Sequence, residues 1–492
     1  MSAQASATNS DSLETAAKPT ENETSTQHII RSDRAFGWRD KIGYAFGDLG
    51  NCFILGLVNS FLMIYYTNVL GIAGATVGLL FLLARFIDAF ADITVGRLTD
   101  TSKLTSEGRF RPWIRKMKYP FLAGAILLFV PIVNQFPMGV KMVYIFFTYI
   151  FYGIFQSAIN IPYGSMASAI SADPNDRTSL STFRSIGSAL GGGLTGFFIP
   201  IFMYATTDTG KRIVSGNHFF IIALVCAGLA YVSYLFTYHL SYERVQVEKT
   251  KPVKLTTVLK GIGKNRALIA LVFADVLLVI NQILAGTTTT YLFNDYFRSP
   301  AAMSVAMLFT YATVILLAPF ATYLTNHFGK KEASVTALFI ATGLYLIMFF
   351  MHTHNEWLFL AMLFIATLGA GLFNLMVWAF ITDVIDYHQV VTGLREDGTV
   401  YGLNSFARKC GQALAGGIGG IMLSVIGYKA SAAGGVAQSA AVVNRIYGLA
   451  TLLPAVCVGV AAVILLLWYP LTKSKTQENT KILKERDAKE AD

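Results

Sequence analysis

The sequence has little charge: only 14% of its 492 residues are Asp, Glu, Lys or Arg, whereas 54% are hydrophobic. Soluble globular domains carry about 25% charged residues, so this composition excludes a water-soluble domain for most of the chain. Cysteine is also scarce, and the four residues lie in apolar stretches with no pair at metal-ligand spacing: Cys52, Cys226, Cys410 and Cys457. Neither disulfides nor a zinc site is therefore indicated.

The sequence also lacks the short motifs of common catalytic sites. It has no Gly-x-Ser-x-Gly, no His-Glu-x-x-His and no phosphate-cradling Gly-Lys-Ser/Thr. The net charge is +10, but the Lys and Arg residues lie in short segments between apolar runs and form no continuous basic face. We therefore expect no enzyme, no cofactor, no bound metal and no nucleic-acid partner.

Long apolar runs are what the chain has in abundance. About twelve of them are long enough to cross a hydrocarbon core of roughly 30 Å. They lie near residues 43–68, 73–97, 117–136, 140–169, 179–206, 217–241, 267–292, 301–326, 332–352, 356–385, 399–427 and 445–470. The sequence therefore predicts an all-α integral membrane protein with the lipid bilayer as its surroundings.

Basic residues predict the topology. They gather after the second, sixth and eighth runs and in the C-terminal tail, which places both termini in the cytoplasm of a multi-pass cell-membrane protein. The longest polar connection divides the runs into two sets of six. We expect a disordered cytoplasmic tail, a first six-helix bundle, a cytoplasmic linker, a second bundle and a C-terminal tail at 1–35, 36–241, 242–265, 266–471 and 472–492.

A faint repeat relates the two sets of six. The connection after the second run contains Asp100 and Arg109, and the equivalent connection after the eighth contains Lys330 and Lys331. Positive-inside charge alone is the alternative explanation of these basic residues. Six plus six helices with matching loops resemble the major facilitator superfamily, in which a binding cavity forms at mid-membrane between the halves.

The second run contains the most informative residues. Arg85, Asp88 and Asp92 recur at spacings of three and four, so they share one face of a helix. Charges at membrane depth are retained where they pair or line a water-filled path. Two carboxylates one turn apart repel each other when ionised, which favours binding of a proton or a small cation. The alternative is a structural ion-paired cluster, although two acids and one base leave an unmatched charge.

Further polar residues occur in the first, fourth and fifth runs. Asp48 and Asn51 share one side of the first helix and are expected to act in gating or in a helix–helix contact. Gln156, Ser157 and Asn160 lie in the fourth run. Arg184 lies early in the fifth run and has five N–H donors for a hydroxyl or a carboxylate; a snorkelling interfacial residue is the alternative.

The second half of the chain also contains charged and polar residues within or beside its apolar runs. Asp383 and Asp386 end the tenth run, and Arg395 lies in the following loop. Lys409 lies inside the eleventh run, where it needs an acidic or a sugar partner. Asn374 shares a helical face with Trp378, whose indole is suited to stack on a sugar ring.

Together these segments resemble the glycoside-pentoside-hexuronide:cation symporters, the melibiose-carrier group of the major facilitator superfamily. The resemblance rests on five motifs: Gly47-Asp48-Leu-Gly50-Asn51, Arg85-Phe-Ile-Asp88-Ala-Phe-Ala-Asp92, Asn160-Ile-Pro162, Asp383-Val-Ile-Asp386-Tyr387, and Gly398 with Lys409. It covers nearly the whole chain after the N-terminal tail. In overall sequence the chain looks closest to carriers of xylosides such as isoprimeverose.

The resemblance implies roles for several residues. Asp88 and Asp92 would be the acids of the cation site, assisted by Ser157 where the family often has Thr. Arg184 and Lys409 would be cations of the sugar site, together with Asn160, Asn374 and Trp378. Asp48, Asn51, Arg85, Asp100, Asp383, Asp386 and Arg395 would serve gating or structure.

Three departures from the family bear on the coupling ion. Sodium-using melibiose carriers have Asp where this chain has Cys52 and Asn160, and Asn where it has Ala91. Sodium requires several oxygen ligands, whereas a proton requires one carboxylate. We therefore expect a glycoside importer coupled to a proton, with sodium as the alternative ion. A facilitator or exchanger without obligatory coupling is the alternative function, and a non-transporting membrane sensor is a third.

Overall fold

The computed structural model describes residues 34–102, 104–171, 173–208, 210, 212–245, 265–392 and 397–491. Nearly all of the predicted N-terminal tail, most of the predicted linker and Arg395 lie outside these residues. Within them the protein is built from long helices joined by short connections.

The first half of the chain forms six long helices, a short helix and a small hairpin. Their bounds are α1 Trp38–Asn68, α2 Gly74–Thr101, α3 Arg111–Leu127, η1 Pro131–Gln135, α4 Met138–Ile170, α5 Pro174–Phe202, β1 Tyr204–Thr206, β2 Arg212–Val214 and α6 Gly216–Leu240. The two strands pair antiparallel, with Ala205 opposite Ile213. The expected end of the fifth run at residue 206 is therefore wrong, because its last residues extend into this hairpin.

The second half repeats the pattern of six long helices and adds one at the C-terminus. Their bounds are α8 Arg266–Tyr291, η2 Leu292–Tyr296, α9 Pro300–Phe328, α10 Lys330–Met351, α11 Glu356–Thr392, α12 Asp397–Val425, α13 Ala440–Leu467 and α14 Lys473–Ala491. Polar residues cap several helix starts: the side chains of Ser215, Asn265, Ser299 and Ser439 each accept a hydrogen bond from a backbone N–H of the first turn. These caps satisfy backbone groups where the chain enters a helix.

Eleven of the described helices are long and apolar enough to span a membrane. They confirm an all-α membrane protein. Helix α12 is not among the eleven, because Arg408, Lys409 and several glycines reduce its hydropathy. It nevertheless lies alongside them and packs against α2 and α8. The polar tail after the last run contains the helix α14, which packs against α10 and α11.

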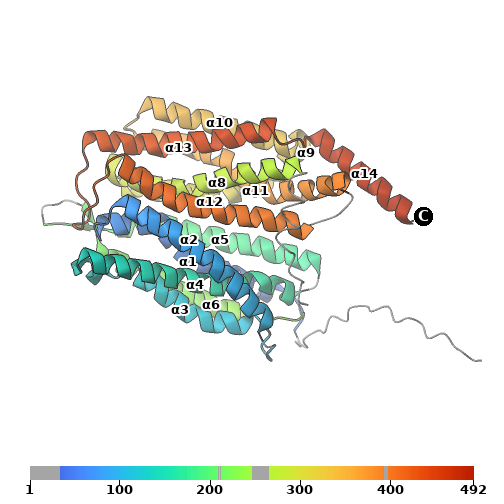
Figure 1. Cartoon of the computed structure of the whole chain (residues 1–492), viewed down its shortest axis with the longest axis horizontal. Coiled ribbons are helices and arrows are strands. Elements are labelled where there is room, and N and C mark those ends of the chain that lie inside the picture. Colours follow the sequence, from blue (N-terminus) through green and yellow to red (C-terminus); the bar gives the residue numbers. More distant parts are fainter. Residues whose placement is uncertain are drawn as a thin grey trace, which may run out of the picture.

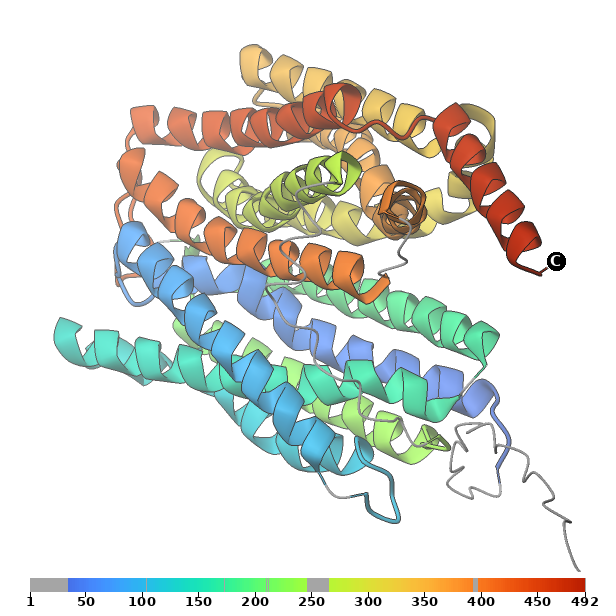
Figure 2. The same ribbon diagram turned by 45° about the vertical axis from the view of Figure 1, so that its right-hand side comes forward.

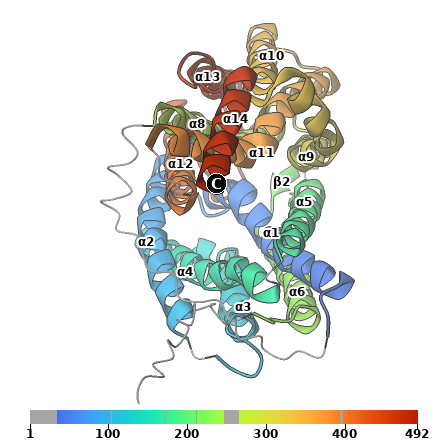
Figure 3. The ribbon, with the colours of Figure 1, turned by 90° about the vertical axis from the view of Figure 1, so that its right-hand side faces the viewer.

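The two halves lie side by side with their long helices running in roughly the same direction (Figures 1 and 2). Seen along the helices, α1 to α6 form one group and α8 to α13 the other (Figure 3). Three pairs of helices join the halves: α1 with α8, α2 with α12 and α5 with α9. Glycines allow α2 and α12 to approach closely, since a Cβ on Gly78 would lie 2.9 Å from Cα of Gly420.

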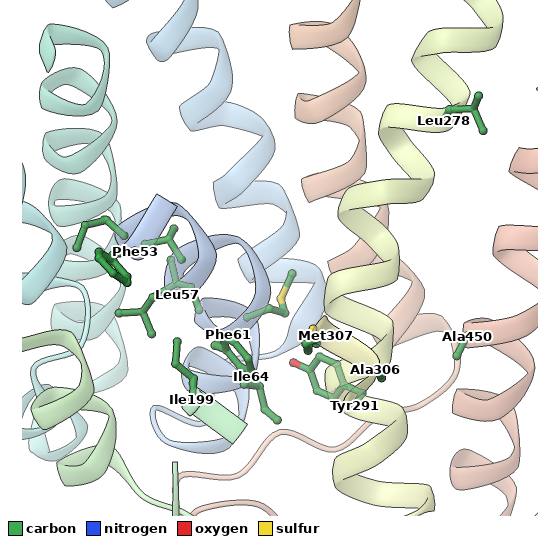
Figure 4. Close-up of a cluster of buried hydrophobic side chains, with 14 of the residues drawn as sticks. Phe53, Leu57, Phe61, Ile64, Ile199, Leu278, Tyr291, Ala306, Met307 and Ala450 are labelled. Atoms are coloured by element: carbon green, nitrogen blue, oxygen red, sulfur yellow. The ribbon is translucent and has the colours of Figure 1, made fainter. Parts of the chain in front are cut away.

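Buried apolar side chains from both halves form one continuous cluster. Figure 4 shows part of it, where Phe61 of α1 is drawn beside Met307 of α9 and Tyr291 of α8. In a membrane, contacts between such side chains replace contacts with lipid. Close van der Waals packing therefore holds the two halves together here.

We call the end of the molecule that contains the start of α1 and α14 the terminal end, and the opposite end the distal end. At the distal end, hydrogen bonds connect the halves. The hydroxyls of Thr67 and Tyr291 lie 2.8 Å apart, the Tyr428 hydroxyl donates to Asn68 Oδ1 at 3.0 Å, and the Val214 N–H donates to the Gly434 carbonyl at 3.0 Å. The distal end is thus closed in this structure.

Candidate functional site

A cavity of about 480 Å³ lies between the two halves, about midway along the helices. Helices α1, α2, α4 and α5 contribute one wall, and α8, α9 and α12 contribute the other. Fifteen of the 24 lining residues are polar or charged, among them the amide side chains of Asn59, Gln156, Gln282 and Gln412. A space of this size, lined by both halves and by hydrogen-bonding groups, is suited to a polar small molecule.

Asp88 lines this cavity on α2. Its Oδ2 lies 3.6 Å from the guanidinium of Arg85, one turn earlier on the same helix. Its Oδ1 is buried, and no hydrogen-bond donor of the described residues reaches it. A buried acceptor without a donor is costly and uncommon, which marks this oxygen as a place for a proton or a cation.

The position of Asp88 depends on a glycine of α4. A Cβ built on Gly153 would collide with Asp88 Oδ1. The carboxyl group therefore occupies the space that any other side chain at position 153 would fill. Ser157, one turn further along α4, is buried and also lines the cavity.

Asp92 lines the same cavity and forms an ion pair with Lys409 of α12. The group Arg85, Asp88 and Asp92 on α2 has an unmatched negative charge, and Lys409 supplies a positive charge from the other half. Lys409 thus has an acidic partner, as a lysine inside an apolar helix requires.

Asn160 lines the cavity on α4, and its Oδ1 lies 3.5 Å from Nδ2 of Asn51 on α1. This pair joins two helices of the first half. Cys52, the next residue on α1, has its sulfur 3.1 Å from the Ser188 hydroxyl on α5. Cys52 and Asn160, the two positions that differ from the Asp of sodium-using melibiose carriers in the sequence comparison above, thus make uncharged contacts.

Arg184 lies apart from the lining residues of the cavity. Its Nε is 3.4 Å from Asp48 Oδ1, and its guanidinium lies over the ring of Tyr163, 5.3 Å from the centroid. In this structure Arg184 and Asp48 tie α5 to α1. The expected contact of Arg184 with sugar stays a prediction.

Asn374 is near the second wall of the cavity, because its Nδ2 lies 3.5 Å from Oε1 of the lining residue Gln282. The side chains of Trp378 and Asp100 lie outside the described part of the structure, although both residues belong to helices, α11 and α2. Their predicted roles therefore stay predictions, as does that of Arg395.

The acids at the end of α11 lie away from the cavity, toward the terminal end. Asp383 accepts a hydrogen bond of 2.7 Å from the Lys330 ammonium at the start of α10. Asp386 follows within one turn and is partly buried. The contact of Asp383 links α10 to α11 within the second half. The role of both acids in gating stays a prediction.

Sequence reasoning missed a second buried charge cluster. Asp275 of α8 accepts hydrogen bonds from Arg408 at 2.6 Å and from Asn404 at 2.9 Å, both on α12. Arg408 lines the cavity, whereas Asp275 does not. A single carboxylate within an apolar run was the signal that could have revealed Asp275, since such residues need a partner at that depth.

Comparison with known proteins places these features in context. The family model described as MFS/sugar transport protein matches residues 43–473. The glucuronide carrier protein homolog of Escherichia coli (strain K12) is 30% identical, over 91% of this chain and 95% of that protein. The uncharacterized symporter YjmB of Bacillus subtilis (strain 168) is 30% identical, over 90% and 94%. The isoprimeverose transporter of Lactiplantibacillus pentosus is 28% identical, over 88% of each.

Solved structures of similar fold are more distant in sequence. A bacterial homolog of the human lysosomal transporter Spinster, in an inward-facing and unoccupied conformation, has a TM-score of 0.62 at 13% identity, over 90% of this chain and 99% of that chain. The nucleoside transporter NupG has a TM-score of 0.59 at 12% identity, over 89% and 100%. These likenesses show the fold alone.

Proposed function

Because this chain belongs to the MFS/sugar transport protein family, we propose that it imports a glycoside into the cell by symport with a cation, and that the cation is a proton. The observation that carries the proposal is Asp88, whose Oδ1 is buried without a hydrogen-bond donor of the described residues in the wall of a cavity that both halves line. A proton on that oxygen gives it a hydrogen and removes the charge.

The surroundings of Asp88 favour a proton over sodium. A sodium ion requires several oxygen ligands and would lie beside the guanidinium of Arg85, only 3.6 Å from the same carboxyl group. Lys409 brings a second positive charge to the neighbouring Asp92. A proton needs no further ligands, and it neutralises the acid without adding an ion beside two cations.

The mechanism we propose is alternating access. The closed distal end and the cavity between the halves correspond to one state of such a cycle, in which the two halves rock about the occupied site. Proton binding at Asp88 or Asp92 alters the ion pairs with Arg85 and Lys409, and Lys409 belongs to the opposite half. Coupling would follow because the strength of the inter-half contact depends on protonation.

The sugar is expected to be a xyloside such as isoprimeverose. The named relatives include an isoprimeverose transporter, which is 28% identical, and a glucuronide carrier homolog, which is 30% identical. We further propose that the protein resides in the cell membrane with its terminal end toward the cytoplasm, since the basic residues gather there.

Substrate-induced alkalinisation tests the function. Isoprimeverose, xylose, melibiose and lactose are added in turn to lightly buffered, energy-starved cells that express the chain, with and without sodium. We expect the external pH to rise with one sugar, independently of sodium, and the rise to be lost in Asp88→Asn. Sugar entry without any response to pH or sodium would identify a facilitator, and a sugar that is bound but never enters would identify a sensor.

A further inference from the structure

The buried cluster on α8 and α12 has no role in the proposed coupling. Asp275 is only 2% exposed, and both of its oxygens are hydrogen-bonded: Oδ1 by the Arg408 guanidinium at 2.6 Å and Oδ2 by the Asn404 amide at 2.9 Å. Asn404 is completely buried, one turn before Arg408 on α12. The carboxylate is thus fixed from two sides.

Such a pair needs an explanation other than stability. Desolvation of two charges offsets most of their attraction, and apolar residues of similar size often stabilise a protein as well or better. Ionisable groups at membrane depth are retained mainly where they serve function. The arrangement here is directional, because Arg408 lines the cavity and Asp275 lies behind it.

The positive charge of Arg408 is therefore balanced by Asp275, which lies on the side of Arg408 away from the cavity. The other two described cations that line the cavity are also paired with acids, Arg85 with Asp88 and Lys409 with Asp92. A guanidinium whose charge is compensated still donates N–H groups to hydroxyls, but it offers no excess charge to a carboxylate. Neighbouring lining residues, Gln282 and Gln412, likewise hydrogen-bond without charge.

We propose that Arg408 is a specificity-determining residue that hydrogen-bonds the hydroxyl groups of an uncharged glycoside, and that Asp275 is the positioning residue that makes the site discriminate against uronic acids. This inference rests on the proposed sugar transport and deepens it. The coupled proton adds one positive charge to the cavity whichever substrate is carried. The contribution of Asp275 to specificity is therefore measured by comparing the substrate preference of the wild type with that of Asp275 variants.

The test uses two probes that differ only at C6 of the sugar: p-nitrophenyl β-glucoside, which is neutral, and p-nitrophenyl β-glucuronide, which is anionic. Uptake into proteoliposomes is measured with each. The wild type is expected to prefer the glucoside. Asp275→Asn removes one negative charge from beside the Arg408 guanidinium and is expected to raise the glucuronide-to-glucoside uptake ratio by about tenfold or more, the size expected for one charge-assisted hydrogen bond.

Three further variants separate positioning from general stability. The double variant Asp275→Asn with Arg408→Gln restores the charge balance, so its uptake ratio is expected to return toward that of the wild type. Arg408→Lys keeps the charge and loses the planar fork, so it is expected to raise KM for the glucoside with a smaller effect on the maximal rate. Asp275→Glu retains a carboxylate and is expected to preserve the wild-type ratio even if Asp275→Asn folds poorly.

The outcomes are distinct. A wild type that prefers the glucuronide, or a ratio unchanged in both Asp275→Asn and the double variant, would overturn the inference and leave sugar transport intact. Uptake of neither probe by a correctly inserted wild type that does respond to isoprimeverose in the alkalinisation assay would also overturn the inference, since Arg408 would then not serve the glucoside. Uptake of neither probe together with no response in the alkalinisation assay would overturn the proposed function and this inference with it.

Discussion

Lys409 of α12 forms an ion pair with Asp92 of α2, and this pair connects the two halves of the protein at the wall of the cavity. The residues are more than three hundred positions apart in the sequence. Asp92 therefore belongs at once to the acid pair of α2 and to the contact between the halves. Under the proposed mechanism, a proton that reaches Asp92 would weaken that contact and so transmit a binding event from one half to the other.

Removing one member of this pair is expected to reduce concentrative uptake strongly. Asp92→Asn leaves Lys409 without its acid and should reduce accumulation of sugar by about tenfold or more, since an uncompensated charge at membrane depth costs several kcal/mol. The double variant Asp92→Asn with Lys409→Gln should recover protein in the membrane but not concentrative uptake. Accumulation ratios and membrane protein levels are measured together.

The control for the Asp92→Asn experiment is a variant that breaks an ion pair at the surface. Lys475 and Glu478 of α14 lie 2.9 Å apart and are both exposed, so Glu478→Gln should leave uptake and protein level unchanged. Full concentrative uptake in Asp92→Asn would contradict the role of the pair.

Gly153 offers a test that leaves every charge in place. In Gly153→Ala the new methyl group would occupy the position of Asp88 Oδ1, so the carboxyl group must move. We expect downhill sugar exchange to persist and proton-coupled accumulation to fall by about tenfold, because misplacement of a reacting group by about 1 Å is costly. Counterflow and pH-driven uptake are compared in the same vesicles.

Gly139 on the same helix is the matched control, because a Cβ there meets nothing within 4 Å. Gly139→Ala should behave as the wild type in both assays. Equal loss in the two variants would show that α4 tolerates no added methyl group and that Asp88 is not specifically affected.

The charged residues of this site could be found from the sequence, but their partners could not. Arg85, Asp88, Asp92 and Lys409 stand out because charge is expensive in an apolar helix. Which acid meets Lys409 depends on how α2 and α12 pack, and that packing depends on glycines such as Gly78 and Gly420 that hydropathy does not distinguish. Long-range pairing of this kind is a property of the folded molecule.

Hydropathy also predicts where the apolar runs lie, but it does not predict their backbone conformation. The fifth apolar run predicts that Tyr204–Thr206 belong to a helix, yet these residues form a strand. Its partner strand donates a hydrogen bond to the Gly434 carbonyl of the other half. Helix α14 was missed for the opposite reason. It has no apolar run, and its contacts with α10 and α11 could not be anticipated from a polar tail.

The distal end gives a prediction about the balance between conformations. Tyr291→Phe with Tyr428→Phe removes the hydrogen bonds to Thr67 and Asn68. Each is worth about 1 kcal/mol, so the pair should shift the equilibrium toward a distal-open state by about tenfold or more. A cysteine at Ser60, which lines the cavity, should then react faster with an impermeant maleimide added from the distal side, in a background without the native cysteines.

Tyr447→Phe is the control for this shift, because the Tyr447 hydroxyl donates to the Met348 carbonyl within one half, at 2.8 Å. It also removes a buried tyrosine hydrogen bond but should leave the labelling rate unchanged. An unchanged rate in the double variant as well would show that these tyrosines do not hold the distal end closed.

Glu243, just after α6, gives a prediction about pH. Its carboxylate accepts hydrogen bonds of 2.7 Å from the backbone N–H groups of Arg109, Phe110 and Arg111 at the start of α3. Burial raises the pKa of the Glu243 carboxyl above its ordinary value, although these N–H groups oppose the shift. The folded protein therefore holds this proton more tightly than the unfolded chain does. Glu243 contributes stability that is complete below the unfolded-state pKa and is lost as pH rises through the folded-state pKa.

Glu243→Gln removes that titration. Thermal unfolding of the purified protein in detergent, followed from mildly acidic to neutral pH, should show the wild type losing stability with rising pH relative to the variant. The variant should be less stable than the wild type at the acidic end, because the amide replaces one acceptor oxygen with a donor that faces backbone N–H groups. Parallel pH profiles of the two proteins would mean that Glu243 holds the start of α3 as a carboxylate whose proton affinity is the same folded and unfolded.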